Sequence, residues 1–192
     1  MNYLVALSVI TSLFYSVYLK ANQENKIDPE YVLKIGTMDL IPYGWEDKHN
    51  QKHGIIYELN HEIGLRLDIP FTNKIYPFKR MLKLLKSAKI DVVSSQAHQE
   101  AMDSGEKLGI QHNVDVIAGT KKGSDIQSMA DLKGKNLIYH LSSSYKELEG
   151  LPSSITRTEN YKQSLMYLYK GKQNHAAVFS EPAYYYWMKD LG

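Results

Sequence analysis

The sequence of 192 residues contains no cysteine. This absence excludes disulfide bonds and thiolate metal sites, and it fits either a cytoplasmic protein or an exported bacterial-type protein. The 23 lysine and arginine residues are balanced by 21 acidic residues and are spread along the chain. Proteins that bind a nucleic-acid backbone usually carry a block of basic residues, and this chain has none. We therefore expect no nucleic acid as a partner.

Sequence motifs of catalysis are also absent. There is no nucleophile elbow, no Walker loop and no dinucleotide-binding fingerprint. The seven histidines do not combine with nearby carboxylates in a known metal-ligand spacing. We therefore expect neither a metal nor a cofactor. Arginine is scarce, since only Arg66, Arg80 and Arg157 occur.

Residues 3–19 form an uncharged apolar run that stops before Lys20, and a polar stretch follows at 22–30. The length of the run lies between that of a secretory signal and that of a minimal membrane span. We expect residues 1–21 to be a signal peptide, with an uncleaved anchor as the alternative. We expect the protein to be periplasmic. It would be attached to the membrane only if this N-terminal segment is not cleaved.

The first half of the remaining chain alternates between strand and helix patterns. A strand at 32–37 leads into a loop rich in Pro, Gly and aromatic residues, Leu40–Trp45. Further strands are expected at 71–76 and 90–93, where β-branched and aromatic residues gather. Two helices are expected between the strands, with apolar stripes at Ile56, Leu59, Ile63 and Leu67 and at Phe78, Met81, Leu82 and Leu85. This βαβαβ order predicts a parallel sheet.

The second half repeats the alternation. Strands are expected at 114–119, 137–139 and 176–179, and helices along Tyr161–Tyr169 and from Ser180 onward. Capping-box patterns occur at Ser128–Asp131 and at Ser144–Glu147. The second pattern places Ser142–Ser144 at the N-terminus of a helix just beyond a strand.

This succession resembles the extracytoplasmic solute-binding proteins of family 3, the amino-acid-type substrate-binding proteins of ABC transporters. The resemblance is carried by LKIGT at 33–37, Gly54, KIDVVS at 89–94, MADLKGK at 129–135 and AAVFSEP at 176–182. It implies an α/β fold of the two-lobed, periplasmic binding protein-like type II, with parallel-dominated sheets and helices on both faces. We place lobe 1 at 32–118 and lobe 2 at 119–192. The family's return strand to lobe 1 is not found before Gly192, so the chain is a fragment or lacks that crossing.

The resemblance also implies a function. We expect binding of a small polar or anionic solute for ABC import or sensing, by a monomer whose protein partner is a permease or sensor. One departure is that no arginine lies between Arg80 and Arg157, where the family's amino-acid binders carry a carboxylate clamp. The alternatives are an exported small-acid-processing enzyme, dehydratase-like, with Glu181 or Glu58 as general acid, and a truncated relic that binds nothing.

The candidate ligand-binding residues follow the predicted strands. Ser94, Ser95 and Gln96 come directly after the strand at 90–93, and ligands in α/β sheets bind beyond the carboxyl ends of strands. Tyr43 and Trp45 are on the loop after the first strand and offer flat surfaces for stacking, or else they cover the core.

The other candidates are chosen for charge and hydrogen bonding. Arg80 offers a planar fork for an anion, or else is a solvated helix residue. Ser142, Ser143 and Ser144 offer hydroxyls and free amides at a helix N-terminus, or else only cap it. Ser180 and Glu181 lie where the family tends to place an acidic residue for a ligand amine, and both also suit helix capping.

Overall fold

The computed structural model describes residues 30–96, 99–171, 173 and 175–191. The predicted signal peptide or anchor, residues 1–21, lies outside the described residues. The chain divides into a unit Met1–Val32, of which only residues 30–32 are described, and a unit Leu33–Gly192 that holds every element described below. Within the described ranges, no helix combines the length and the apolar character that crossing a bilayer would require.

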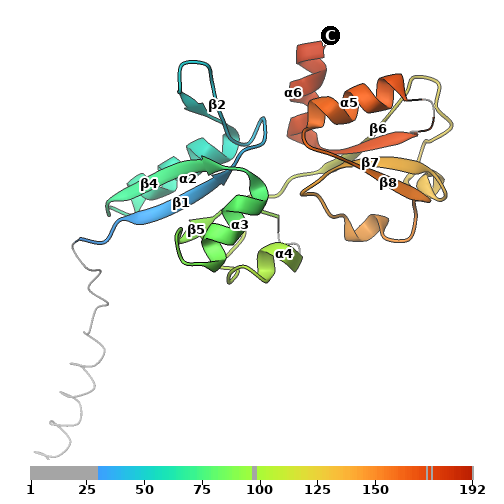
Figure 1. Ribbon diagram of the computed structural model, residues 1–192. Helices are drawn as coiled ribbons and strands as arrows, with labels where there is room; N and C mark the ends of the chain where they lie inside the picture. Colours follow the sequence, from blue (N-terminus) through green and yellow to red (C-terminus); the bar gives the residue numbers. More distant parts are fainter. Residues whose placement is uncertain (1–29, 97–98, 172, 174, 192) are drawn as a thin grey trace, which may run out of the picture. The chain divides into compact units, whose positions relative to one another are not determined.

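The first sheet contains three parallel strands in the order β4-β1-β5 (Figure 1). These strands are β1 (Leu33–Met38), β4 (Phe71–Tyr76) and β5 (Val92–Val93). A small antiparallel hairpin, β2 (Trp45–Glu46) and β3 (Lys52–His53), interrupts the connection that follows β1. The parallel order expected from the sequence is confirmed.

Helices cover both faces of this sheet. They are α2 (Ile55–Arg66) and α3 (Phe78–Lys86). A Cβ placed on Gly36 of β1 would lie 3.3 Å from Met81 of α3, whereas the next residue, Thr37, accepts a hydrogen bond of 2.9 Å from Asn60 of α2. Because successive residues of a strand point to opposite faces, the two helices lie on opposite sides of β1. Next along the chain, α4 (Gln99–Met102) is a single turn.

The buried face of α2 differs from the predicted stripe. The helix buries Ile56, Asn60 and Gly64, while Ile63 and Leu67 of the predicted stripe are 38% and 51% exposed. Asn60 can be buried because its amide makes three side-chain hydrogen bonds, and Gly64 because it allows close contact with the Phe71 ring. A polar and a small residue therefore replace the large apolar ones at the interface.

The second sheet contains four strands in the order β6-β9-β7-β8. Strand β6 (Val116–Thr120) is antiparallel to β9 (Ala176–Ser180), and β7 (Asn136–His140) is parallel to both β8 (Ser154–Thr158) and β9. The predicted boundary between residues 118 and 119 falls inside β6. The division into lobes 32–118 and 119–192 stays a prediction.

The two faces of the second sheet belong to two core clusters. Leu137 and Val178 pack with the short 3-10 turns η1 (Met129–Leu132) and η2 (Lys146–Leu148). Their neighbours Ile138 and Phe179 pack with α5 (Tyr161–Lys170) and α6 (Glu181–Leu191). The second cluster also takes in Leu40, Tyr43 and Ile56, so it joins the loop after β1 and helix α2 to the second sheet in one core.

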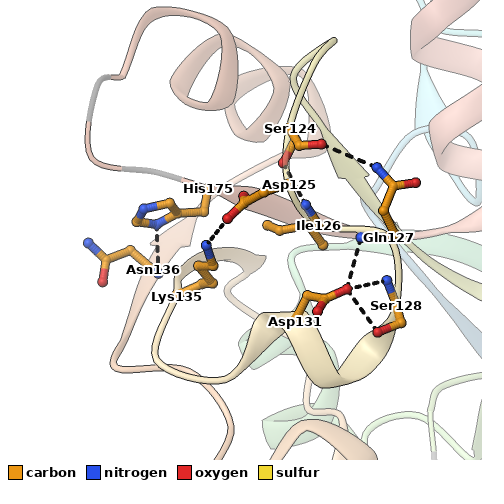
Figure 2. Close-up of polar contacts among 9 residues, drawn as sticks. All are labelled: Ser124, Asp125, Ile126, Gln127, Ser128, Asp131, Lys135, Asn136 and His175. Atoms are coloured by element: carbon orange, nitrogen blue, oxygen red, sulfur yellow. Dashed lines mark hydrogen bonds and ion pairs between the residues drawn. The ribbon is translucent and has the colours of Figure 1, made fainter.

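The first predicted capping box is confirmed (Figure 2). The backbone N–H and the hydroxyl of Ser128 donate to Asp131 Oδ2 over 2.8 and 2.9 Å. In the same segment Lys135 Nζ lies 2.8 Å from Asp125 Oδ2, and the N–H of Asn136 donates to His175 Nδ1 over 3.0 Å, which ties the start of β7 to the residue before β9 (Figure 2).

The second predicted capping box is wrong. The turn η2 has three residues, its N-cap is Tyr145, and no side chain caps it. Gly150 adopts a φ of 76° two residues after η2, and Pro152 follows, so the chain turns away before a helix can extend. Contrary to the prediction from the sequence, Ser142–Ser144 are therefore not at the N-terminus of a regular helix.

Candidate functional site

A pocket of about 410 Å³ lies where strands of both sheets end. Met38, Val93 and Ser180 are the last residues of β1, β5 and β9, and all three line it. Ser142 and Ser143, which come just after β7, line it as well. The volume is within the range of small-molecule sites, and the position is the one that open α/β sheets use for ligands.

Seven of the eleven predicted residues meet in this pocket, and four do not. The lining includes Tyr43, Ser94, Ser95, Gln96, Ser142, Ser143 and Ser180. Trp45, Arg80, Ser144 and Glu181 are outside the lining. All eleven stay predictions as ligand contacts, because proximity to the pocket is not binding.

The four residues outside the lining have other surroundings. Arg80 is exposed and lies over the ring of Tyr76, with its guanidinium carbon 5.9 Å from the ring centroid. Trp45 contacts Tyr186 of α6 edge-on, with 6.0 Å between the ring centroids. Ser144 is exposed. The N–H of Glu181 donates to the carbonyl of Asp115 over 2.8 Å at the start of α6.

The N-terminus of α2 positions Tyr43. The carbonyl of Tyr43 accepts hydrogen bonds from the N–H groups of Ile56 (2.9 Å) and Tyr57 (3.1 Å) in the first turn of the helix. Gly54 makes this approach possible, since it has a φ of 126° and a Cβ there would clash with the Tyr43 carbonyl oxygen. The loop after β1 is thus fixed by backbone bonds, and the Tyr43 side chain is held at the pocket.

A buried hydrogen-bond network supports the side of the pocket that the first sheet supplies. Asn60 Oδ1 accepts from Ser94 Oγ (2.8 Å) and from Gln111 Nε2 (3.1 Å). Asn60 Nδ2 donates to Thr37 Oγ1, and Thr37 in turn donates to Asn73 Oδ1 over 2.8 Å. Because the Ser94 proton is committed to Asn60, Ser94 offers an acceptor oxygen to a ligand.

Arg157 supports the opposite side of the pocket from behind. Its guanidinium donates to the carbonyls of His140 and Ser143 and lies 5.2 Å from the centroid of the Tyr139 ring. These contacts hold the turn that carries Ser142 and Ser143. Arg157 is absent from the pocket lining, so its role here is to position the turn.

Two buried tyrosines and two buried serines form the inner part of the lining: Tyr43, Tyr161, Ser143 and Ser180. Burial raises the pKa of the Tyr43 and Tyr161 phenols, because the charged phenolate loses its hydration. The phenols therefore stay protonated at neutral pH.

Sequence reasoning missed two parts of the lining. The segment from Gly109 to Val114, together with Lys107, lies at the end of the polar stretch 96–113, for which the sequence predicted no strand or helix. It reaches the pocket because β6 is antiparallel to β9, with Val116 beside Ser180, so β6 starts at the edge where β9 ends. The direction of β6 would have revealed this. Tyr161 was assigned only to a helix stripe.

The chain can be compared with protein families and with characterised proteins. No family model matches the chain. The L-cystine-binding protein TcyA of Bacillus subtilis (strain 168) is 28% identical over 148 residues, which are 73% of this chain and 54% of TcyA. The chain thus spans about half the length of this curated relative.

Solved structures match a larger part of the chain than this relative does. An ancestral arginine-binding protein bound to arginine aligns with a TM-score of 0.68 at 23% identity, over 85% of this chain and 76% of that one. A putative ABC transporter binding component from Wolinella succinogenes, complexed with lysine, aligns with a TM-score of 0.69 at 17% identity, over 85% and 74%. The fold is that of type II solute-binding proteins. The predicted fold class, and the resemblance to family 3 binding proteins, are confirmed.

Proposed function

We propose that this protein binds a small polar solute in the pocket between its two sheets, outside the cytoplasm, and presents it to an ABC permease or a sensor without catalysing a reaction. The observation that carries the proposal is the pocket itself, where the ends of β1, β5 and β9 and the turn after β7 place hydroxyl and amide groups. The relatives support it, since their names state binding of L-cystine, arginine and lysine.

The enzyme alternative has less support. Neither Glu181 nor Glu58, the proposed general acids, belongs to the described lining, and that lining contains no other Asp or Glu. The relic alternative is disfavoured by the network of Ser94, Asn60 and Gln111. Such a network costs ordering and desolvation, and here it is joined through well-formed bonds to pocket-lining groups.

Isothermal titration calorimetry of the purified protein against the amino acids, including L-cystine, and against simple sugars tests the proposal. We expect saturable binding by at least one solute, weakened roughly 5- to 20-fold by Ser180→Ala, which removes a pocket hydroxyl. The matched control is Ser87→Ala, because Ser87 is exposed and outside the lining. Product analysis of the same mixtures should return the solute unchanged. Conversion of the solute would establish the enzyme alternative, and no binding would refute the proposal.

A further inference from the structure

The inner part of the pocket contains an unsatisfied donor. Tyr43 is 8% exposed and Tyr161 is 4% exposed, and both line the pocket. Among the described residues, no hydrogen bond of ordinary geometry reaches the buried Tyr43 hydroxyl, although Ser180 lies close enough to lower its pKa against the larger effect of burial. A buried hydroxyl left unpaired costs free energy that a ligand group could recover. This orphaned oxygen is a second observation, beside the pocket, that points to a ligand.

The directions of the hydrogen bonds show which groups in this part of the pocket can donate to a ligand. Ser180 Oγ donates to the Tyr161 hydroxyl oxygen at the long distance of 3.5 Å. The Tyr161 proton is therefore still available, as is the proton of Tyr43. Both phenols remain protonated, as argued above, so both present O–H donors. A ligand group that accepts hydrogen bonds can bind both of these donors.

The scarcity of charged residues in the pocket lining also limits which ligand groups can bind there. Of the described residues that line the pocket, none is Asp, Glu or Arg, and Lys107 is exposed. A guanidinium or ammonium group placed beside the phenols would find no counter-ion among the described lining residues, and an unpaired buried charge is strongly unfavourable. A carboxylate would face two donors but no buried cation from the described lining.

We propose that Tyr43, Tyr161 and Ser180 form the specificity subsite of the pocket, and that this subsite takes an uncharged hydrogen-bond-accepting group of the solute, such as an amide oxygen. This inference rests on the proposed function and adds the chemical class of the recognised group. Among the solved structures that resemble this chain, an ancestral arginine-binding protein is described as bound to glutamine, and two structures are described as bound to arginine and lysine.

Four amino acids test the subsite because they share their α-groups and differ at the end of the side chain: L-glutamine, L-glutamate, L-arginine and L-lysine. Calorimetric titration should show glutamine binding at least about 10-fold more tightly than arginine and lysine, as expected for cations without a counter-ion. It should also bind more tightly than glutamate. Equal or tighter binding of arginine or lysine overturns this inference and leaves the proposed function standing. A lack of binding by every solute in both panels overturns the proposed function itself.

Tyr43→Phe tests the donor directly, since it removes one oxygen and keeps the ring. We expect glutamine affinity to fall about 5- to 20-fold, the usual effect of one lost hydrogen bond. Tyr139→Phe is the matched control, because the Tyr139 hydroxyl is also buried and unpaired among the described residues but lines no part of the pocket. Thermal melting of both variants checks that they fold. An equal effect of the two substitutions on affinity overturns the role of Tyr43.

Discussion

Ser142 Oγ lies 2.6 Å from His140 Nδ1. The other ring nitrogen, Nε2, is 2.9 Å from the backbone carbonyl of Glu159, which can only accept. Nε2 therefore carries the proton of the neutral ring, and Nδ1 accepts the proton of Ser142. In consequence Ser142, like Ser94, offers an acceptor oxygen to the pocket, opposite in polarity to the phenols.

Acid should destabilise the protein through His140. Burial lowers the pKa of His140, with a further contribution from Arg157 and an opposing one from the Glu159 carbonyl. In the unfolded chain the His140 ring becomes protonated near pH 6.5, whereas in the folded chain it is protonated only at lower pH. Between these values the unfolded state binds more protons, so the free energy of unfolding falls as pH decreases from 7 to 5.

His140→Gln should remove this part of the pH dependence. Urea unfolding at pH 5 and pH 7 measures it as a difference from the wild type, which cancels the effect of other titrating groups. His49→Gln is the control, since His49 is exposed. Equal slopes in the wild type and His140→Gln would contradict the assignment.

Asn60→Ala should destabilise the fold and loosen the pocket together. The substitution removes the shared acceptor of Ser94 and Gln111 and the donor to Thr37 in a residue that is 2% exposed. We expect a loss of about 2–3 kcal/mol in the free energy of unfolding, measured by urea denaturation. Gln99→Ala on the exposed turn α4 is the control. A loss as small as the control's would mean that the network is not maintained in solution.

Gly64→Ala should be destabilising although alanine favours helices. A Cβ at this position would lie 2.6 Å from the Phe71 ring, so α2 must move away from β4. Overpacking exceeds the gain in helix propensity, and we expect a net loss of about 1–2 kcal/mol. Gly109→Ala is the control, because a Cβ there meets nothing within 4 Å. Thermal melting compares the two, and an unchanged melting temperature for Gly64→Ala would show that the helix adjusts freely.

Arg80→Ala should leave solute affinity within about twofold of the wild type, since Arg80 is exposed and outside the pocket lining and a distant site adds little. Ser94→Ala, which removes a lining hydroxyl, is the positive control. Calorimetry with the tightest-binding solute of the panel measures both. A tenfold or greater loss for Arg80→Ala would show that Arg80 reaches the solute after all, and would restore the sequence-based interpretation of this residue.

The sequence predicted well those features that depend on local pattern. Short β-branched runs predicted β1, β4, β5, β6, β7 and β9, whereas the edge strand β8 (Ser154–Thr158) was not predicted. The residues just after the predicted strands, Ser94 and Ser142 among them, line the pocket because parallel strands end at a common edge. The buried face of α2 was missed because Asn60 and Gly64 are buried through tertiary contacts that no hydropathy pattern contains. The position of Arg80 could not be read from the sequence either, since its guanidinium lies over the ring of Tyr76 and outside the pocket lining, and its role as a ligand contact stays a prediction.

The core cluster that joins Leu40 and Tyr43 to Ile138 and Phe179 has a consequence for the order of folding. These partners are separated by roughly a hundred residues or more of chain, so closing the contact carries a large loop entropy cost, and it cannot form until β9 has been synthesised. The parallel strands β1, β4 and β5 can pair earlier, with the apolar side of Tyr43 still uncovered. We expect the nascent first sheet to expose an apolar surface that a chaperone could bind before the pocket has formed.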